Sequence, residues 1–417
     1  MLREMLARKL NDRRSLAMVG LAALTGLIFL RSSVWPALWN ATHGFPVYYT
    51  PARLILEGRW SARIYDDAWF GDEVAAQTNG RIREVYSPNP PGASLLLIPL
   101  AWLDMAGARV AWILLNLLFL AVSLWLIAAA LSWSGEVVFR AGMIAFALSY
   151  APLRENFRLG QAYVFLLFLF ALAFWSLSRQ RWVSTGIALG TAALAKLSGG
   201  VLWLMLASRG RWREIVAGAL VGAGLLLTSV IITGWEGWKK FFSILPEHLA
   251  GNRWPAVLAF QTTPSFFQHL FVADAQWNPR PLWHQPWLAV VLSVGVSGVA
   301  LAVTLWRSRR SDFDLAFAAA ATLGVVLFPL AEEYHYTLLL LPLAVIASRI
   351  ARKPFDARDV AGLVIAALLL SAPWPYTSQR LNDGWYALLA YPRLYGGWLV
   401  WVWLIRHMLP IHEYTSD

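Results

Sequence analysis

Apolar residues in this chain form long continuous runs that are separated by shorter polar stretches. A helix that crosses a bilayer needs about 20 mostly apolar residues, whereas a strand of a membrane barrel shows about ten residues of alternating polarity. The runs therefore predict membrane-spanning helices, with shorter ones possible where neighbouring helices bury them. The predicted spans cover residues 16–38, 110–131, 141–152, 162–177, 183–195, 201–207, 215–233, 286–306, 315–330, 337–350, 360–373 and 397–409.

The predicted fold is an all-α polytopic membrane protein, a single transmembrane domain over residues 1–417 with about 12 transmembrane helices in a range of about 10 to 13. Two segments, 40–91 and 234–284, are long and polar enough to lie outside the membrane, and both are rich in Trp, Tyr and Pro. The chain then divides into a first outer loop with juxtamembrane helices (40–107), a helical core (108–233), a second outer loop (234–285) and C-terminal helices (286–417).

Composition supports the membrane assignment, because 58% of the residues are hydrophobic and only 14% are charged, against about a quarter charged in soluble proteins. Soluble enzymes, DNA-binding domains and disordered scaffolds are excluded. The chain has no cysteine, so it has no disulfide framework, no thiolate metal site and no cysteine nucleophile. The histidines are scattered without a helical spacing that would pair them as ligands, so no metal site is expected.

The net charge of +11 would suggest a nucleic-acid partner in a soluble chain, but no nucleic-acid-binding signature is present. The basic residues instead form clusters between apolar runs, as in loops that face an anionic cytoplasmic leaflet. No small-residue cleavage site follows the first run, so we expect an uncleaved first span. The clusters are Arg3, Arg8, Lys9, Arg13 and Arg14; Arg179 and Arg181; Arg209, Arg211 and Arg213; Arg307, Arg309 and Arg310; and Arg349, Arg352 and Lys353.

Placing all these clusters in the cytoplasm gives a topology with both termini inside and the two long loops outside. It requires that residues 92–104 do not span, and their 13 positions predict a re-entrant or juxtamembrane helix instead. The loop 154–161, the loop 332–336 and the end of the run at Lys196 then all lie on the extracytoplasmic side. Most of the unusual polar residues are thereby collected on one face.

Lys196 follows a strongly apolar run and precedes Ser198, Gly199 and Gly200, which allow a sharp bend. An ammonium in such a run is costly and is usually functional or paired. We interpret Lys196 as a phosphate contact, for which a lysine point charge is suited. The alternative is a lysine whose side chain extends to the membrane interface without a specific role.

The two outer loops add further polar groups. Residues 154–161 carry two guanidinium groups, a carboxylate and two amides, and residues 332–336 carry two carboxylates and an imidazole. Either loop alone could be an ordinary solvated loop. Three polar clusters on one face favour a shared site, to which these loops contribute Arg154, Asn156, Arg158, Gln161, Glu332, Glu333, His335 and Tyr336.

The order of the motifs resembles the GT-C class of polytopic glycosyltransferases and, within it, glycosyltransferase family 87. Four motifs carry the resemblance, and two weaker ones extend it over most of the chain, from about residue 45 to residue 342. The four are Phe45-Pro46-Val47-Tyr48-Tyr49-Thr50-Pro51-Ala52 with Glu57-Gly58, Tyr86-Ser87-Pro88-Asn89-Pro90-Pro91, residues 156–161 before an apolar helix, and Lys196 after a Gly-rich helix. The weaker two are His335-Tyr336 and Thr263-Pro264-Ser265.

The resemblance implies a GT-C-like helical bundle in the plasma or inner membrane, with an active site that faces outward. It implies transfer of a mannose-like sugar from a polyprenyl-phosphate donor to a lipid or glycan acceptor, without a cofactor or divalent cation. Lys196 would hold the donor phosphate, with Arg154 or Arg158 nearby. Substrate contacts would come from Tyr48, Tyr49, Asn156, Gln161, His335 and Tyr336.

In that family an aspartate directly before the residue matching Phe45 acts as the base, and this chain has Gly44 there. Our first candidate for the base is the neighbouring His43, followed by Glu332 or Glu333. Glu57, Asp66 and Asp67 are further acids of the first loop that could replace it. The alternatives are a polyprenyl-lipid transporter or flippase, and a catalytically inactive lipid-binding member of the family.

Overall fold

A computed structural model describes residues 2–133, 137–250, 257–352 and 356–408. Every named element in these ranges is helical, and extended pairing is confined to two isolated bridges, so the predicted all-α class is confirmed. The α-helices are α1 (Leu2–Phe29), α2 (Trp35–Trp39), α3 (Phe45–Leu56), α4 (Asp67–Gln77), α5 (Met105–Ala130), α6 (Val137–Ser149), α7 (Ala151–Leu159), α8 (Tyr163–Ser178), α9 (Trp182–Lys196), α10 (Gly200–Ser208), α11 (Trp212–Thr233), α12 (Trp235–Leu249), α13 (Thr263–Phe271), α14 (Pro286–Ser308), α15 (Phe313–Val326), α16 (Leu340–Arg352), α17 (Ala357–Ser371) and α18 (Pro392–His407).

Short helices of other kinds connect or extend them. A π-helical turn, η1 (Leu30–Val34), joins α1 to α2 into one continuous helical rod. The remaining segments are 3-10 helices: η2 (Ala62–Tyr65), η3 (Pro91–Leu95), η4 (Glu333–Leu339), η5 (Gln379–Asn382) and η6 (Gly384–Leu389).

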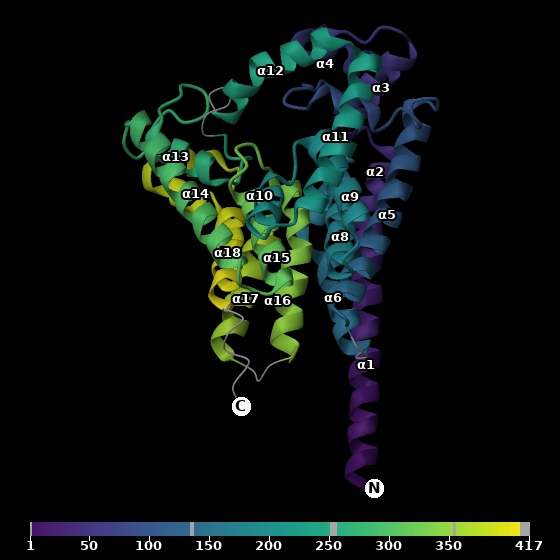
Figure 1. The fold of residues 1–417 in the computed structure, drawn as a ribbon, viewed down its shortest axis with the longest axis vertical. Helices are drawn as coiled ribbons and strands as arrows, with labels where there is room; N and C mark the ends of the chain where they lie inside the picture. The colour runs from purple at the N-terminus through teal and green to yellow at the C-terminus, as the bar shows by residue number, and fades with distance from the viewer. Residues whose placement is uncertain (1, 134–136, 251–256, 353–355, 409–417) are drawn as a thin grey trace.

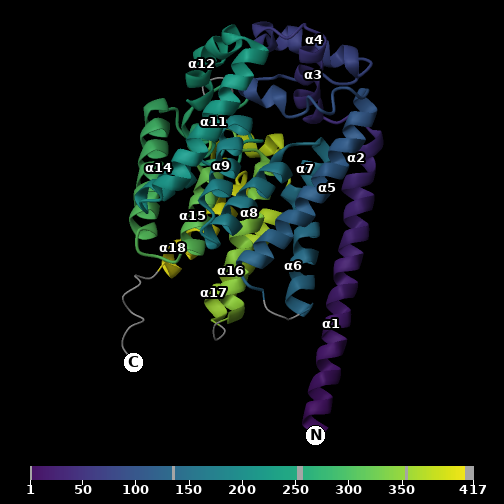
Figure 2. The same cartoon turned by 45° about the vertical axis from the view of Figure 1, so that its right-hand side comes forward.

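The helices pack side by side along one axis. In both views α8, α15 and α16 lie between the outer helices α1 and α14, and α3, α4 and α12 cover one end (Figure 1, Figure 2). The helix α8 is buried along nearly its whole length and packs against α5, α9 and η4. Through these contacts α8 connects the N-terminal helices α5 and α9 with η4 of the C-terminal half.

Five helices in the described ranges are long and apolar enough to cross a membrane. The pair α6 and α7, which bends by 51°, makes a sixth if it is one broken span, and α8 and α15 are shorter apolar helices. The total of about 12 spans and the position of the N-terminus inside therefore remain predictions. The five are 12–39, α5, α11, α14 and the rod of η4 and α16, Glu333–Arg352.

Residues 154–161 were predicted to form a loop, and that prediction was wrong. They lie mostly in α7, which begins after a break at Tyr150 and ends at Gly160, whose φ of 68° is left-handed. The helix forms because Leu153, Asn156 and Phe157 recur at helical spacing and are all buried on one side. Pro152 is tolerated in its first turn, where backbone N–H groups have no partner within the helix.

Two other local predictions also need correction. The expected helix over 92–104 is only the short 3-10 helix η3 followed by turns. Pro99 removes a backbone donor from the middle of this stretch, and a proline inside an α-helix breaks its hydrogen-bond ladder. The expected loop 332–336 is instead the start of η4, which Glu332 and His335 cap reciprocally.

Candidate active site

The turn after α9 places Lys196. The helix ends at this residue, Leu197 adopts a left-handed φ of 51° and Gly199 one of 91°, and α10 starts at Gly200. The predicted bend is therefore present. Positive φ values are costly for a leucine and easy for a glycine, so Gly199 is the residue that makes the reversal inexpensive.

Among the residues that the structure describes, the ammonium of Lys196 has one hydrogen-bond partner and two aromatic neighbours. Its Nζ donates to Asn89 Oδ1 at 2.8 Å, and it lies 4.8 Å from the ring centre of Tyr48 and 5.6 Å from that of Tyr163. Aromatic faces attract a cation but leave its N–H groups free for an anion. The ammonium has three N–H donors, and Asn89 accepts from one of them. Lys196 therefore keeps hydrogen-bonding capacity for a ligand.

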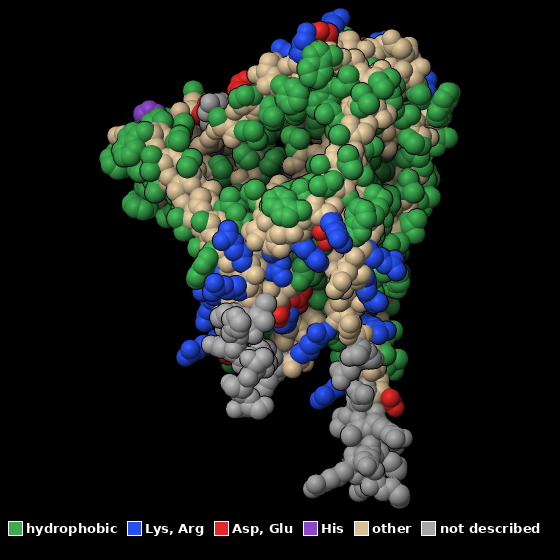
Figure 3. Space-filling view, viewed as in Figure 1, with side chains coloured by type: hydrophobic (Ala, Val, Ile, Leu, Met, Phe, Trp, Pro, Cys, Tyr) green, Lys and Arg blue, Asp and Glu red, His purple; other side chains and the backbone are tan. Residues whose placement is uncertain are grey.

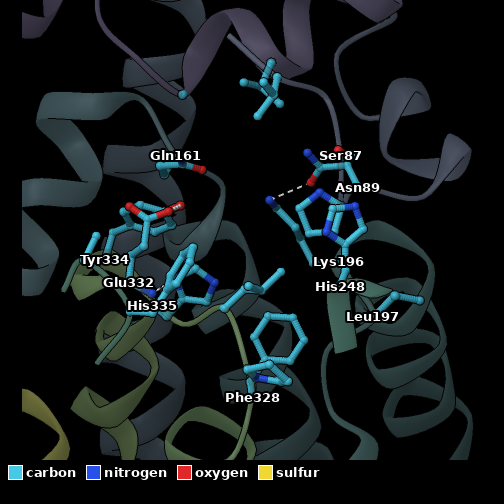
Figure 4. A pocket seen from close by; sticks show the side chains of 18 of the residues that line it. Ser87, Asn89, Gln161, Lys196, Leu197, His248, Phe328, Glu332, Tyr334 and His335 are labelled. Carbon is cyan, nitrogen blue, oxygen red and sulfur yellow. Dashed lines mark hydrogen bonds between the residues drawn. The ribbon is translucent and has the colours of Figure 1, made fainter. Parts of the chain in front are cut away.

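Lys196 lines a cavity of about 420 Å³ whose wall includes residues of α3 and α12. Residues from distant parts of the chain meet there, as the close view shows for Asn89 and Lys196 on one side and Glu332, Tyr334 and His335 on the other (Figure 4). The polar and aromatic side chains on its wall are His43, Tyr48, Glu84, Ser87, Asn89, Gln161, Tyr163, Lys196, His248, Phe260, Trp277, Phe328, Glu332, Tyr334 and His335.

The wall opposite Lys196 is built by the start of η4. Tyr334 Oη donates to Glu332 Oε1 at 2.9 Å, and the backbone N–H of Glu332 donates to His335 Nδ1 at 3.0 Å. A neutral imidazole that accepts at Nδ1 carries its proton on Nε2. His335, whose ring lies 4.0 Å from that of Tyr163, therefore offers an N–H donor.

Burial raises the pKa of Glu332 to about 7, partly offset by the hydrogen bond from Tyr334 and by the positive charge of Lys196. Near neutral pH this carboxyl group therefore exists in both protonation states. A carboxyl of this kind can accept a hydrogen bond from a hydroxyl or donate one to it.

Gln161 and Gly44 shape the wall beside α3. Tyr48 Oη donates to Gln161 Oε1 at 2.7 Å, which fixes the amide between α3 and α8. Gly44, the N-cap of α3, has a φ of 92°, and a Cβ added there would lie 2.7 Å from Gln161 Nε2. Both the backbone conformation and the close approach of Gln161 therefore require glycine at position 44.

The family model described as glycosyltransferase family 87 matches residues 88–331, more than half of the chain. The chain belongs to glycosyltransferase family 87. The resemblance inferred from the motifs is thus confirmed, and family membership favours an enzyme over a transporter.

Two relatives of this family-87 chain bear the description polyprenol-phosphate-mannose-dependent alpha-(1-2)-phosphatidylinositol pentamannoside mannosyltransferase. The protein of Mycobacterium tuberculosis is 23% identical over 289 residues, which cover 68% of this chain and 64% of the relative. That of Mycolicibacterium smegmatis is 26% identical over 230 residues, or 54% of this chain and 52% of the relative. The match thus spans less than two thirds of either relative. No solved structure matches the chain.

Six of the side chains predicted for the site of this family-87 protein line the cavity: His43, Tyr48, Gln161, Lys196, Glu332 and His335. The other six do not. Arg154 donates to Ser32 and Ser33 on η1, and Arg158 pairs with Glu155 at 3.1 Å on the exposed side of α7. The two guanidinium groups expected near the donor phosphate therefore serve the packing and the surface of α7.

The remaining predicted residues have structural partners elsewhere. Glu333 accepts from the buried Arg393 at 2.7 Å and from Tyr376, and Tyr49 Oη donates to Leu103 O at 2.8 Å. Asn156 Oδ1 accepts from Tyr163 N at 2.9 Å, and Tyr336 donates to Gln261 O. None of these four lines the cavity.

Sequence reasoning missed Glu84, Tyr163 and Tyr334 as cavity residues, and it quoted Asn89 only as part of a motif. A signal existed for Asn89, because its Tyr-Ser-Pro-Asn-Pro-Pro setting was already recognised as specific. Glu84 lies in an extended stretch before that motif, and no spacing indicated that it contacts α3. In the described ranges no three His, Asp or Glu side chains are grouped to hold a metal ion. The expected independence from divalent cations remains a prediction.

Proposed function

We propose that this protein transfers a mannose-like sugar from a polyprenyl-phosphate donor to a hydroxyl of a lipid or glycan acceptor, at the extracytoplasmic face of the plasma or inner membrane. The observation that carries the proposal is the ammonium of Lys196, held in a cavity whose wall combines polar side chains with apolar ones. Family membership and the printed activity of the two relatives support it.

Lys196 is suited to hold the phosphate of the donor. During transfer, the bond between the sugar and the phosphate breaks and negative charge grows on the phosphate oxygen, which a fixed cation stabilises. The amide of Asn89 orients the ammonium through their 2.8 Å hydrogen bond. The N–H of His335 adds a neutral donor across the cavity.

The polyprenyl chain would follow an apolar path away from Lys196. A second cavity of about 210 Å³ shares Tyr163, Leu197, Phe328, Pro329 and His335 with the first. Beyond these shared residues its wall is almost entirely apolar, with Val201, Leu323, Val325, Leu327 and Leu338. A donor with a charged head and a hydrocarbon tail would place its head in the first cavity, beside Lys196, and its tail against the apolar wall of the second cavity.

The sugar and the acceptor would occupy the polar part of the first cavity. Tyr48 and Gln161, which are joined by a hydrogen bond, present an aromatic ring and an amide on one wall, and Glu332 presents its carboxyl on another. Hydroxyl-rich ligands are recognised by such convergent polar groups on a partly apolar wall. We assign these residues to the sugar and Lys196 to the phosphate.

Charge distribution supports an outward-facing site. Lys and Arg side chains gather across the lower part of the molecule, the end where α1 begins, whereas α3, α4 and α12 lie at the other end (Figure 3). Loops with clustered Lys and Arg remain in the cytoplasm. The cavity, whose wall includes residues of α3 and α12, would then open on the opposite side of the membrane.

The test is sugar transfer in liposomes that contain the purified protein, radiolabelled polyprenyl phosphate mannose and lipids extracted from the host cell. We expect Lys196→Ala to reduce the transfer rate by about 100-fold, the loss typical of removing one fixed group that stabilises developing charge. The matched control is Lys239→Ala, since Lys239 is an exposed lysine on α12 paired with Glu236. Full activity of Lys196→Ala would contradict the phosphate role, and absence of transfer by the unaltered protein would contradict the function.

A further inference from the structure

Glu84 and His43 form a hydrogen-bonded pair on the wall of the cavity that contains Lys196. His43 Nδ1 lies 2.9 Å from Glu84 Oε1, and the backbone N–H of Gly44 donates to the same oxygen at 3.0 Å. Glu84 comes from the stretch between α4 and η3, 40 residues further along the chain than Gly44. The fold therefore brings a carboxylate to the start of α3 that the local sequence lacks.

Position 44 cannot supply a carboxylate of its own in this structure. A Cβ there would lie 2.7 Å from Gln161 Nε2 and 2.9 Å from Leu159 O, closer than real Cβ atoms approach their neighbours. Gln161 is held in place by Tyr48, so the obstruction is not a loose side chain. The carboxylate of Glu84 instead accepts a hydrogen bond from the backbone N–H of Gly44 and so lies next to that residue.

The fold fixes the position of the Glu84 side chain. Its side chain is 16% exposed, and it accepts two hydrogen bonds from nitrogen donors. The carboxylate also lies at the N-terminus of α3, a helix of 12 residues, where the aligned peptide dipoles stabilise negative charge. A carboxylate fixed in this way can hold a neighbouring imidazole in one orientation.

His43 has the complementary arrangement. When Nδ1 donates to a carboxylate, the lone pair of a neutral imidazole is on Nε2, which can then accept a proton. The His43 side chain is 66% exposed and lines the cavity, so an acceptor molecule can reach it. Glu332, the other acid on the wall, instead has an oxygen bonded to Tyr334 and lies across from Lys196.

We propose that His43 is the general base of the transfer and that Glu84 is the residue that positions it. This inference rests on the proposed function. His43 Nε2 takes the proton of the acceptor hydroxyl while the hydroxyl oxygen bonds to the anomeric carbon of the donor sugar. The bond from that carbon to the phosphate oxygen breaks, and its electron pair leaves with polyprenyl phosphate, which is held by Lys196. The proton remains on the imidazole, where Glu84 stabilises the resulting cation.

The test uses the full-length protein in the liposome assay with radiolabelled polyprenyl phosphate mannose. We expect His43→Ala and Glu84→Gln each to lower kcat by about 100-fold or more with little change in the KM for the donor, because general base catalysis contributes about 10²–10⁴-fold. The matched controls are His284→Ala and Asp72→Asn, an exposed histidine and an exposed carboxylate outside the cavity.

Added imidazole separates a chemical role from a structural one. It should restore part of the activity of His43→Ala but none of that lost in Lys196→Ala, and Glu84→Asp should retain more activity than Glu84→Gln. A near-normal kcat in His43→Ala or Glu84→Gln, while the unaltered protein transfers sugar, would contradict the roles assigned to His43 and Glu84. The proposed function would be unaffected by that result. If Glu332→Gln alone abolished turnover, Glu332 would be the base. Absence of any transfer by the unaltered protein would overturn both proposals.

Discussion

At the scale of single residues, the cavity depends on a few polar groups whose surroundings change their chemistry. Glu332 is an ordinary glutamate by sequence, but its burial in the fold raises its pKa to about 7. The positive charge of Lys196 across the cavity opposes this rise without cancelling it. The protonation state of the Glu332 carboxyl group is therefore set by residues that only the tertiary structure brings near it.

The titration of Glu332 predicts a pH dependence of stability. Between about 4.5 and about 7 the folded protein keeps the Glu332 proton while the unfolded chain has lost it, so the stabilisation present below this window is lost as pH rises through it. We expect the thermal unfolding midpoint in detergent to fall less from pH 5 to pH 8 in Glu332→Gln than in the unaltered protein. Glu236→Gln, at an exposed site on α12, is the control. An identical fall in all three proteins would contradict the assignment.

At the scale of helices, α9, the helix that ends at Lys196, packs closely against α11. Gly186 and Gly190 on α9 face Gly218 and Gly222 on α11, each pair spaced by four residues. A Cβ on Gly190 would lie 2.5 Å from Gly218 O, so the two backbones are in direct contact. Small residues at this spacing let membrane helices approach closely.

This contact predicts that bulk on α11 affects the site at the far end of α9. Gly218→Leu should push α11 away from Trp203 of α10, with which a Cβ there would clash, and from Gly186 O of α9, from which it would lie 3.2 Å. It should lower the stability by about 1–3 kcal/mol as overpacking does, and reduce sugar transfer because Lys196 moves. Gly224→Leu is the control on the same helix, since a Cβ there would meet nothing within 4 Å. The measurements are the thermal unfolding midpoint and the sugar-transfer rate of both variants. Equal values for Gly218→Leu and Gly224→Leu would contradict a role of the contact between α9 and α11.

At the scale of the whole molecule, the larger gathering of Lys and Arg side chains in Figure 3 lies toward the end opposite α3 and α12. Lys and Arg side chains gather toward the lower part of the molecule in Figure 3, and α3 and α12, which contribute residues to the cavity wall, lie at the other end (Figure 1). This separation follows from the positive-inside rule if the polar chemistry takes place outside the cytoplasm. The topology can be tested independently of activity.

Because the chain has no cysteine, single cysteines can report which side is which. We expect a membrane-impermeant maleimide to label Asp72→Cys in intact spheroplasts, and to label Arg310→Cys only after permeabilisation. Asp72 is exposed on α4, and Arg310 follows α14 in a basic cluster. The reverse pattern would place the cavity in the cytoplasm and overturn the proposed orientation.

Much of the architecture could be predicted from the local pattern of residues. The apolar runs indicated the helical class, because a chain in lipid must satisfy its backbone hydrogen bonds within each segment. Lys196 was recognisable because a charge at the end of an apolar run is costly. The ordered motifs indicated the family, which the family match confirms.

Only the tertiary structure decided which polar side chains share the cavity. Arg154 and Glu333 looked like site residues but are bonded to Ser32 and Arg393, whereas Glu84 was inconspicuous and lies against His43 and Gly44. The physical reason is the distance along the chain between the residues that interact. Helix formation depends on neighbours within a few positions, whereas these contacts join residues 40 to 122 positions apart and follow from helix packing.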